Sequence, residues 1–161
     1  AVKGEGLDVA EEALQEIVSA LDYVSIEGRK PNSFREGVLF SAAANADALL
    51  VTLHKSEADY SPTTMYQDYA ISPELFHWES QSVTTVASKT GQRYLNHRST
   101  GSHVLLFTRP QKVSALGTGA PYLFLGEADY AEHRGERPIA ITWHLRTPMP
   151  TADFAVASVV L

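Results

Sequence analysis

The stretch Ile139–Leu145, which reads Ile-Ala-Ile-Thr-Trp-His-Leu, decides the fold class of this chain. Its odd-numbered positions are large and apolar, and Ala140, Thr142 and His144 alternate with them. Because successive side chains of a strand point to opposite faces of a sheet, the alternation predicts a strand with one buried face. Such a strand needs neighbouring strands and a core to cover it.

Short apolar or alternating runs separated by turn-forming residues continue this texture from Leu50 onward. The pattern is typical of a compact β-rich domain. A helical segment is expected at Thr90–Arg98, among the strands. The strands predicted besides Ile139–Leu145 are Leu50–His54, Leu75–Gln81, His103–Arg109, Tyr122–Gly126 and, more weakly, Ala155–Leu161.

The first third of the chain has helical spacing instead. Apolar residues at 7, 10, 14, 17, 18 and 21 predict one amphipathic helix, with glutamates on its other side. The alanine-rich run Ser41–Leu50 predicts a second helix with Ser41 as its cap. We therefore expect a helical segment over residues 1–49, either a linker or part of the domain, followed by a β-rich domain over residues 50–161.

Composition excludes several classes of protein. The 161 residues suffice for one well-buried core, and the chain has no cysteine, which rules out disulfides, thiolate zinc sites and cysteine nucleophiles. No apolar run approaches the roughly 18 residues of a membrane span, and no signal-peptide pattern opens the chain. We expect a cytoplasmic protein with no membrane partner, and the initial Ala1 is consistent with a piece cut from a longer polypeptide.

The charge of the chain is unevenly distributed. The net charge is −6, and residues 1–60 account for all of it, with 5 basic and 11 acidic residues (5 − 11 = −6). Between Glu79 and Glu127 there is no acidic residue at all. An acid-free basic segment suits contact with phosphate groups, although a solvated basic face is the alternative. Its cations are Lys89, Arg93, Arg98, Arg109 and Lys112.

Motifs of known catalytic sites are absent from the sequence. It has no nucleophile elbow, no phosphate-binding glycine loop of the Walker type and no zinc-protease motif, and its six histidines show no metal-ligand spacing. Carboxylates at Asp68, or at Glu127, Asp129 and Glu132, leave a small hydrolase or nuclease as one open alternative. We predict no catalytic residue, no metal and no cofactor.

Aromatic and amide side chains surround the basic window. In the predicted strand Leu75–Gln81, Phe76 and Trp78 share one face, while His77 and Gln81 share the other. One interpretation buries Phe76 and Trp78 and turns His77, Glu79 and Gln81 outward as specific groups. The other makes Trp78 the wall of a pocket.

A series of motifs in order resembles a family of domains of unknown function at the C-terminal end of bacterial DEAD/DEAH-box helicases, often with a phospholipase D-type nuclease domain in front. The resemblance covers roughly residues 50–150. It is carried by Lys55–Glu57, Tyr60–Pro62, Tyr66–Ser72, Phe76–Gln81, Thr90–Tyr94, Leu105–Arg109, Tyr122–Gly126 and Arg137–Pro138.

The resemblance implies a part in DNA restriction or phage defence, in which this domain selects the target for the helicase and nuclease of the same polypeptide. The strand order and the Tyr122–Gly126 strand also look like the PUA-like superfamily, which includes the SRA and EVE readers of modified bases. The fold expected is therefore α+β, a PUA-like mixed β-barrel with short helices. The finger motif of SRA domains is not present as such, so their flipped-base pocket cannot be transferred by position.

The resulting hypothesis is a non-catalytic domain that binds double-stranded DNA, with a methylated or otherwise modified base. Single-stranded binding and a protein-interaction or regulatory module, with the acidic N-terminal helix as its contact, are the alternatives. Lys89, Arg93, Arg98, Arg109 and Lys112 are predicted to hold phosphates. The predicted base-recognition pocket consists of Tyr66, Asp68, Tyr69, His77, Trp78, Gln81 and Tyr94.

Overall fold

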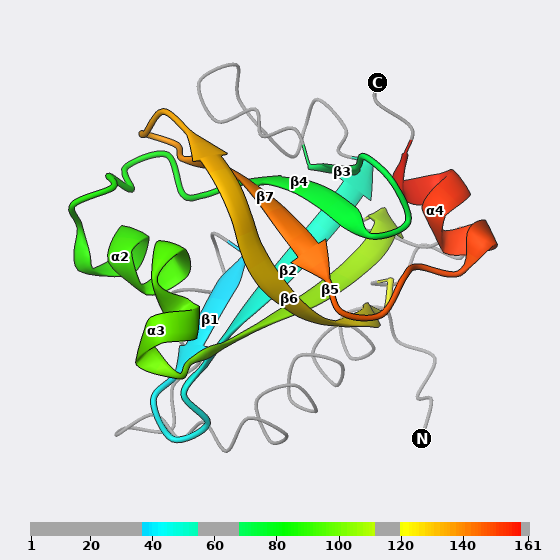
Figure 1. Cartoon of the computed structure of the whole chain (residues 1–161). Helices are drawn as coiled ribbons and strands as arrows, with labels where there is room; N and C mark the ends of the chain where they lie inside the picture. Colours follow the sequence, from blue (N-terminus) through cyan, green and yellow to red (C-terminus); the bar gives the residue numbers. More distant parts are fainter. Residues whose placement is uncertain (1–36, 55–67, 112–119, 159–161) are drawn as a thin grey trace.

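Seven strands form one mixed sheet in the computed structural model, which describes residues 37–54, 68–111 and 120–158 (Figure 1). Three short helices lie beside it, so this part of the chain is mostly β and of the α+β class. The strands are β1 Val38–Ser41, β2 Ala46–His54, β3 Tyr69–Ala70, β4 Leu75–Glu79, β5 His103–Gln111, β6 Leu123–Arg134 and β7 Ala140–Leu145; the helices are α2 Lys89–Leu95, α3 His97–Thr100 and α4 Thr151–Ala157.

The strand order across the sheet is β1-β2-β5-β6-β7-β4-β3. β2 and β5 run parallel, with Ala46 opposite His103, and every other neighbouring pair is antiparallel. Within the described ranges β1 and β3 are edges that do not pair with each other, so the closed barrel expected from the sequence is not observed there. These edges have only four and two residues, which leaves little backbone for closing a barrel.

The alternating residues of Ile139–Leu145 give the strand one buried face, as predicted. Ile139, Ile141 and Trp143 are completely buried and Leu145 nearly so, while His144 is exposed. Burying each such side chain contributes about 1.5–3 kcal/mol. Their face of β7 therefore belongs to the main core.

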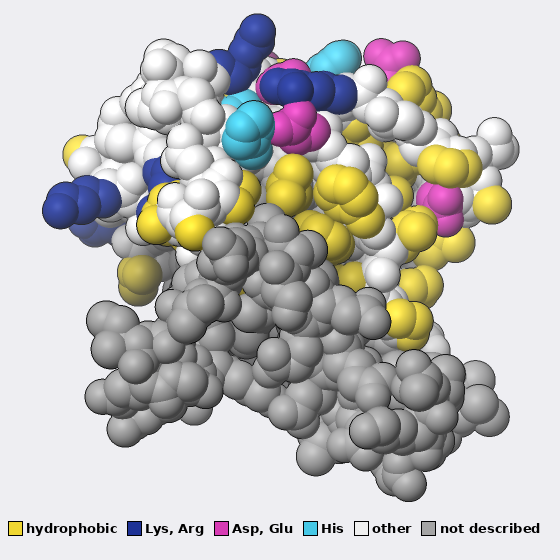
Figure 2. All heavy atoms as spheres, turned by 90° about the horizontal axis from the view of Figure 1, so that it is seen from below, with side chains coloured by type: hydrophobic (Ala, Val, Ile, Leu, Met, Phe, Trp, Pro, Cys, Tyr) yellow, Lys and Arg dark blue, Asp and Glu magenta, His cyan; other side chains and the backbone are white. Residues whose placement is uncertain are grey.

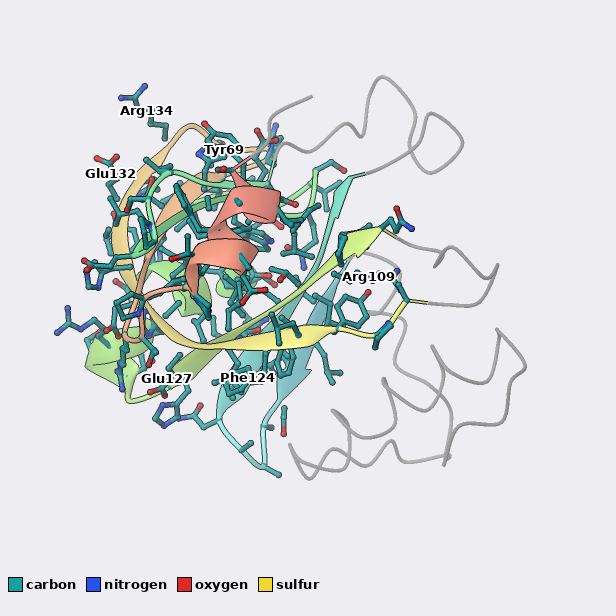
Figure 3. All side chains as sticks on the ribbon, turned by 90° about the vertical axis from the view of Figure 1, so that its right-hand side faces the viewer. Tyr69, Arg109, Phe124, Glu127, Glu132 and Arg134 are labelled. Carbon is teal, nitrogen blue, oxygen red and sulfur yellow. The ribbon has the colours of Figure 1, made fainter. Side chains whose placement is uncertain are left out.

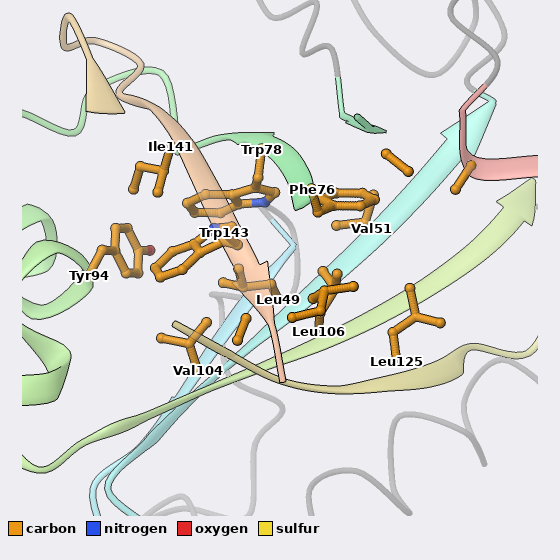
Figure 4. Packing of buried hydrophobic residues seen from close by; sticks show 14 of the residues in the cluster. Leu49, Val51, Phe76, Trp78, Tyr94, Val104, Leu106, Leu125, Ile141 and Trp143 are labelled. Atoms are coloured by element: carbon orange, nitrogen blue, oxygen red, sulfur yellow. The ribbon is translucent and has the colours of Figure 1, made fainter. Parts of the chain in front are cut away.

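The main core lies inside the curve of the sheet (Figure 4). Phe76 and Trp78 of β4 are buried in it, whereas His77 and Glu79 are half-buried, which agrees with the first of the two interpretations. Gln81 differs from that interpretation, because its side chain turns inward and accepts hydrogen bonds from Tyr94 and Thr84. The indole rings of Trp78 and Trp143 lie 6.2 Å apart between centroids. Other large members of this core are Leu49, Val51, Tyr94, Val104 and Leu106.

Two predicted elements are wrong. Residues Ser41–Leu50 form no helix, because they make the end of β1, a turn and the start of β2, and cross-strand pairing overrides the helix propensity of alanine. The weaker strand proposed at Ala155–Leu161 is wrong for residues 155–157, which belong to α4. The helix expected at Thr90–Arg98 is confirmed as α2 and α3, with Asn96 between them.

The amphipathic helix predicted near residues 7–21 lies outside the described residues. β2 runs across residue 50, where the sequence pattern changes. Among the helices that the structure describes, none has the length and apolar character needed to span a bilayer.

Candidate nucleic-acid interface

The Thr90–Tyr94 motif packs α2 against the rest of the domain. The Ser88 hydroxyl caps this helix by accepting a hydrogen bond from the Gly91 N–H at 3.0 Å. A Cβ atom at Gly91 would lie 2.1 Å from the Thr85 carbonyl oxygen, which no side chain can do without moving backbone. Glycine is thus required here for close packing, and the next residues of the motif turn inward.

Arg93 binds a buried carboxylate of the sheet. Its Nε and Nη2 donate to the two carboxylate oxygens of Asp47 at 2.8 and 2.9 Å, and the Asp47 side chain is completely buried. Burial raises the pKa of the Asp47 carboxyl, against the lowering effect of the hydrogen bond and charge of Arg93. The guanidinium also lies 4.1 Å from the centroid of the Phe40 ring. Arg93, predicted as a phosphate ligand, is placed by the structure in the framework.

Three predicted pocket residues come together inside the core. The Tyr94 hydroxyl donates to Gln81 Oε1 at 2.9 Å, and the Tyr94 ring meets Trp78 edge-on with 5.2 Å between centroids. Tyr94 is completely buried and Trp78 is 4% exposed (Figure 4). In this arrangement the two rings pack against other protein side chains and present no open face to a base.

Three others meet on the outer side of the β3–β4 edge. The Tyr69 and His77 rings stack at 4.8 Å between centroids, with planes 19° apart, and both are half-buried. Asp68 Oδ1 accepts the Glu79 N–H at 2.9 Å, so this carboxylate extends the pairing of the two strands. Tyr66, the remaining predicted pocket residue, lies outside the described residues.

The predicted phosphate ligands divide into framework and surface groups. Arg109 Nε donates to Thr52 Oγ1 at 2.9 Å, and its guanidinium lies 4.5 Å from the centroid of the Tyr122 ring. Lys89 and Arg98, in contrast, are exposed, and within the described part of the chain neither forms an ion pair or side-chain hydrogen bond. Lys112 falls outside that part.

Two further exposed cations were not predicted as phosphate ligands. Arg134 is the last residue of β6, and Arg137 lies in the turn between β6 and β7. No described residue forms an ion pair with either side chain. Figure 3 shows Arg134 pointing away from the sheet. The signal that could have found them is the turn sequence Arg-Gly-Glu-Arg-Pro at residues 134–138, in which two cations flank a glycine turn.

Loop 81–88 leads from β4 into α2 and is hydrogen-bonded to the β6–β7 hairpin. The Val86 N–H donates to Glu136 Oε1 at 3.0 Å, and the Arg137 N–H donates to the Thr84 carbonyl oxygen at 2.9 Å. α2, α3 and the hairpin therefore lie at one end of the molecule, on the left in Figure 1. Val83, in the middle of this loop, is 76% exposed. This end of the domain carries four exposed cations that form no ion pair with another described residue, and it also carries an exposed apolar side chain. We call it the cationic end and define it by Lys89, Arg98, Arg134, Arg137 and Val83.

Two of the first three acidic residues that follow the basic window, Glu127 and Asp129, are paired. Arg146 donates to Asp129 through Nε and Nη2 at 3.1 and 3.0 Å and also contacts Glu127, which His103 contacts from β5. The hydrogen bond from Arg146 is the largest cause that lowers the pKa of Asp129. Figure 2 shows blue, magenta and cyan side chains next to one another on one face of the molecule. Glu127 and Asp129 thus neutralise an arginine in this structure, and Glu132 stays exposed.

A buried histidine fixes α3 on the sheet. His97 Nε2 accepts the Tyr130 backbone N–H at 2.9 Å, and its Nδ1 lies 3.4 Å from the Ser102 carbonyl oxygen. A ring nitrogen that accepts from an amide is unprotonated, so the imidazole is neutral. Burial lowers the pKa of His97 in agreement with this arrangement. Across residues 37–54, 68–111 and 120–158, no three His, Asp or Glu side chains are grouped to hold a metal ion.

The chain matches a known protein family over most of its length. A family model with the description "Domain of unknown function (DUF3427)" matches residues 16–156. The matched range includes every strand described above and begins within the acidic first third of the chain. No curated protein matches the chain.

Proposed function

The chain belongs to this family of domains of unknown function, and we propose that it acts as a non-catalytic DNA-binding domain that contacts double-stranded DNA with its cationic end. The observation that supports the proposal is the exposure of Lys89, Arg98 and the two hairpin arginines with no ion pair to another described residue. Such cations can replace the counterions of DNA phosphates. Arg93 cannot do so without leaving the buried carboxylate of Asp47 without its counterion.

Loop 81–88 supplies the group that reads the base in this proposal. The exposed Val83 side chain lies in the loop that leads into α2, and hydrogen bonds of Val86 and Thr84 tie this loop to the hairpin. The helical cations and the hairpin cations would then hold phosphates on the two sides of a groove. A small branched apolar side chain suits contact with a methyl group in the major groove, either of thymine or of a methylated base. This arrangement replaces the flipped-base pocket, because Trp78 and Tyr94 are buried.

The biological setting remains part of the proposal. The motif resemblance favours a domain attached to a helicase and nuclease that restrict foreign DNA, for which this domain selects modified target sites. An open mixed sheet with short helices at one end is compatible with a relative of the PUA-like readers. This step is an analogy of fold and motif, so it sets the choice of DNA probes and carries no residue assignment.

Binding measured by fluorescence anisotropy at several salt concentrations tests the proposal. Four phosphate contacts predict a slope of log affinity against log salt of about −3.6 on duplex DNA, at about −0.9 per contact. Arg98→Gln is expected to reduce the slope by about 1. Arg146→Gln is the matched control, because it removes the same charge from an arginine already paired with Asp129 and should leave the slope unchanged.

Base reading is tested separately with matched duplexes that contain unmodified cytosine, 5-methylcytosine, 5-hydroxymethylcytosine or N6-methyladenine. Val83→Ser is expected to weaken binding to the preferred methylated duplex about tenfold and to leave the salt slope intact. No binding to any duplex at low salt would reject DNA binding. Equal binding by a variant that carries Gln at all four cations would reject the cationic end as the binding surface.

A protein-interaction or regulatory module is the second candidate function. One observation favours it: Phe124 of β6 is 54% exposed although it is large and apolar. This candidate predicts no affinity for DNA and a stable complex with another part of the helicase. Co-purification of the domain with separately expressed helicase domains, lost in Phe124→Ser, would support it.

A further inference from the structure

The sheet has a second apolar face, on the side of β1, β2, β5 and β6 that points away from the main core. Leu39 and Ala48 are completely buried there, and Ala46 and Leu50 are 3% and 7% exposed. Among the described residues, those that pack against them all come from the sheet itself or its connections: Ala44, Leu105, Phe107 and Tyr122.

The margin of this face is apolar and open. Phe107 and Phe124 lie 4.9 Å apart between ring centroids, and Phe124 is more than half exposed. Hydrophobic side chains, drawn in yellow, gather on the side of the molecule that Figure 2 shows, and Phe124 lies at the lower margin of the sheet in Figure 3. A sheet with apolar side chains on both faces requires a layer on each side.

The sequence before β1 has the pattern that such a layer requires. At 100° per residue, Leu7, Ala10, Leu14, Ile17, Val18 and Leu21 fall within a stripe about 100° wide. The glutamates at 11, 12 and 16 lie outside this stripe. Of the other ranges outside the described structure, 22–36, 55–67 and 112–119 are rich in polar residues, proline or glycine and contain no comparable stripe, and 1–6 and 159–161 are too short to form one.

Dimensions and connectivity agree with this pairing. A helix over residues 7–21 is about 22 Å long, and four strands are about 14 Å wide between the outer axes, so one helix covers most of the face. Residues 22–36 can extend to about 50 Å, which does not limit the approach. They lead into Gly37, at the start of the edge strand β1. The family match from residue 16 onward also includes part of the stripe.

We propose that residues 7–21 form an amphipathic helix that packs its apolar stripe on the second face of the sheet. This intramolecular contact makes the N-terminal segment the second layer of the domain. The carboxylates of the segment then point to solvent on the side remote from the main core, so that the domain is acidic on this side and cationic at its α2–α3 end.

Paramagnetic broadening in NMR spectra of the whole chain tests the contact, and the absence of native cysteine allows labels at single sites. Spin labels on Ala44→Cys and Phe124→Cys, at two margins of the second face, should broaden the amide signals of residues 7–21. A label on Arg134→Cys is the control, since it lies far from Phe124 (Figure 3), and should leave these signals sharp.

Two outcomes would overturn the proposal. The signals of residues 7–21 could remain sharp with both face labels, which would exclude packing on this face. They could instead broaden in isotope-enriched protein without a spin label when it is mixed with spin-labelled protein, which would assign the face to a second copy of the chain.

Stability gives an independent test with adjacent, matched substitutions. Leu14→Asp places a charge in the stripe and is expected to lower the melting temperature by several degrees and to speed amide exchange in β2 and β5. Gln15→Asp adds the same charge outside the stripe and should change neither. Equal effects of the two substitutions would contradict the proposal, whatever the affinity for DNA.

Discussion

The inner and outer sides of the α2–α3 unit both carry basic residues, but these residues have different roles. Gly91, Arg93, Tyr94 and His97 face inward, where they contact a loop carbonyl, a buried carboxylate, a glutamine and a strand amide. Lys89 and Arg98 face solvent without an ion pair to any described residue. The number of cations along a sequence therefore overstates the positive charge that is available for binding, because an arginine of a basic segment can be used to neutralise a buried carboxylate.

The largest expected effect comes from removing the inner cation. Arg93→Met replaces the arginine by an apolar side chain of roughly similar length and leaves Asp47 buried without its counterion. This should lower the free energy of unfolding by about 3–5 kcal/mol. Urea denaturation measures it. The double variant Arg93→Met with Asp47→Leu should recover most of the loss, because it removes the orphaned charge as well. A single variant within about 1 kcal/mol of the unaltered protein would show that Arg93 is no framework residue.

A somewhat smaller loss is expected at the helix contact. Gly91→Ala forces a methyl group against the Thr85 carbonyl oxygen and should lower the free energy of unfolding by about 3 kcal/mol, despite the better helix propensity of alanine. Thr90→Ala, on the neighbouring half-exposed position, is the control and should cost almost nothing. If Gly91→Ala stabilised the protein, the close approach of α2 would be wrong.

Acid should destabilise the inner side through His97. Burial lowers the pKa of this imidazole; Asp129 acts in the opposite direction, whereas Arg98 and Arg146 lower it further. The unfolded state therefore binds more protons once the pH falls below about 6.5, so stability is complete above that pH and declines below it. Unfolding at about pH 8 and about pH 5 measures the decline. His97→Gln keeps an acceptor for the Tyr130 N–H but cannot titrate, and it should show a weaker pH dependence; an unchanged dependence would assign it to other groups.

The smallest effect on stability is expected on the outer side. Lys89→Gln combined with Arg98→Gln should change the free energy of unfolding by less than about 0.5 kcal/mol, because neither side chain contacts a described partner. The same protein should bind duplex DNA with a salt slope smaller by about 2. A large loss of stability would mean that these cations belong to the framework as Arg93 does, and the comparison between the two sides would fail.

Much of the sheet could be predicted from local pattern. The alternation in Ile139–Leu145 identified a buried face, and predicted strands at Leu75–Gln81 and His103–Arg109 match β4 and β5 closely. β6 was predicted only over its apolar beginning at Tyr122–Gly126, because its remainder carries polar side chains on an exposed hairpin arm. The helix predicted at Ser41–Leu50 was wrong because alanine has a high helix propensity, and the strands that pair with this segment are distant or not evident in the sequence.

The candidate site was less predictable because its partners are distant in sequence. Nothing near Arg93 indicates that Asp47 binds it, and composition does not tell which side of a seven-residue helix faces inward. Trp78 and Tyr94 have the chemistry of stacking residues, but the neighbouring core decides their burial. Arg134 and Arg137 were overlooked because acidic neighbours hide them from a search for acid-free windows.

The parallel pairing of β2 with β5 has a consequence for the order of folding. β2 is an inner strand, yet its partner on one side begins at His103, after β3, β4, α2 and α3 have been made. During synthesis the edge of β2 that pairs with β5 stays open until β5 has been made. Closing such a distant contact is slow compared with forming a hairpin. The hairpin is therefore the part of the nascent chain most exposed to wrong pairing, and a chaperone or an early-folding neighbour would have its greatest effect before β5 emerges.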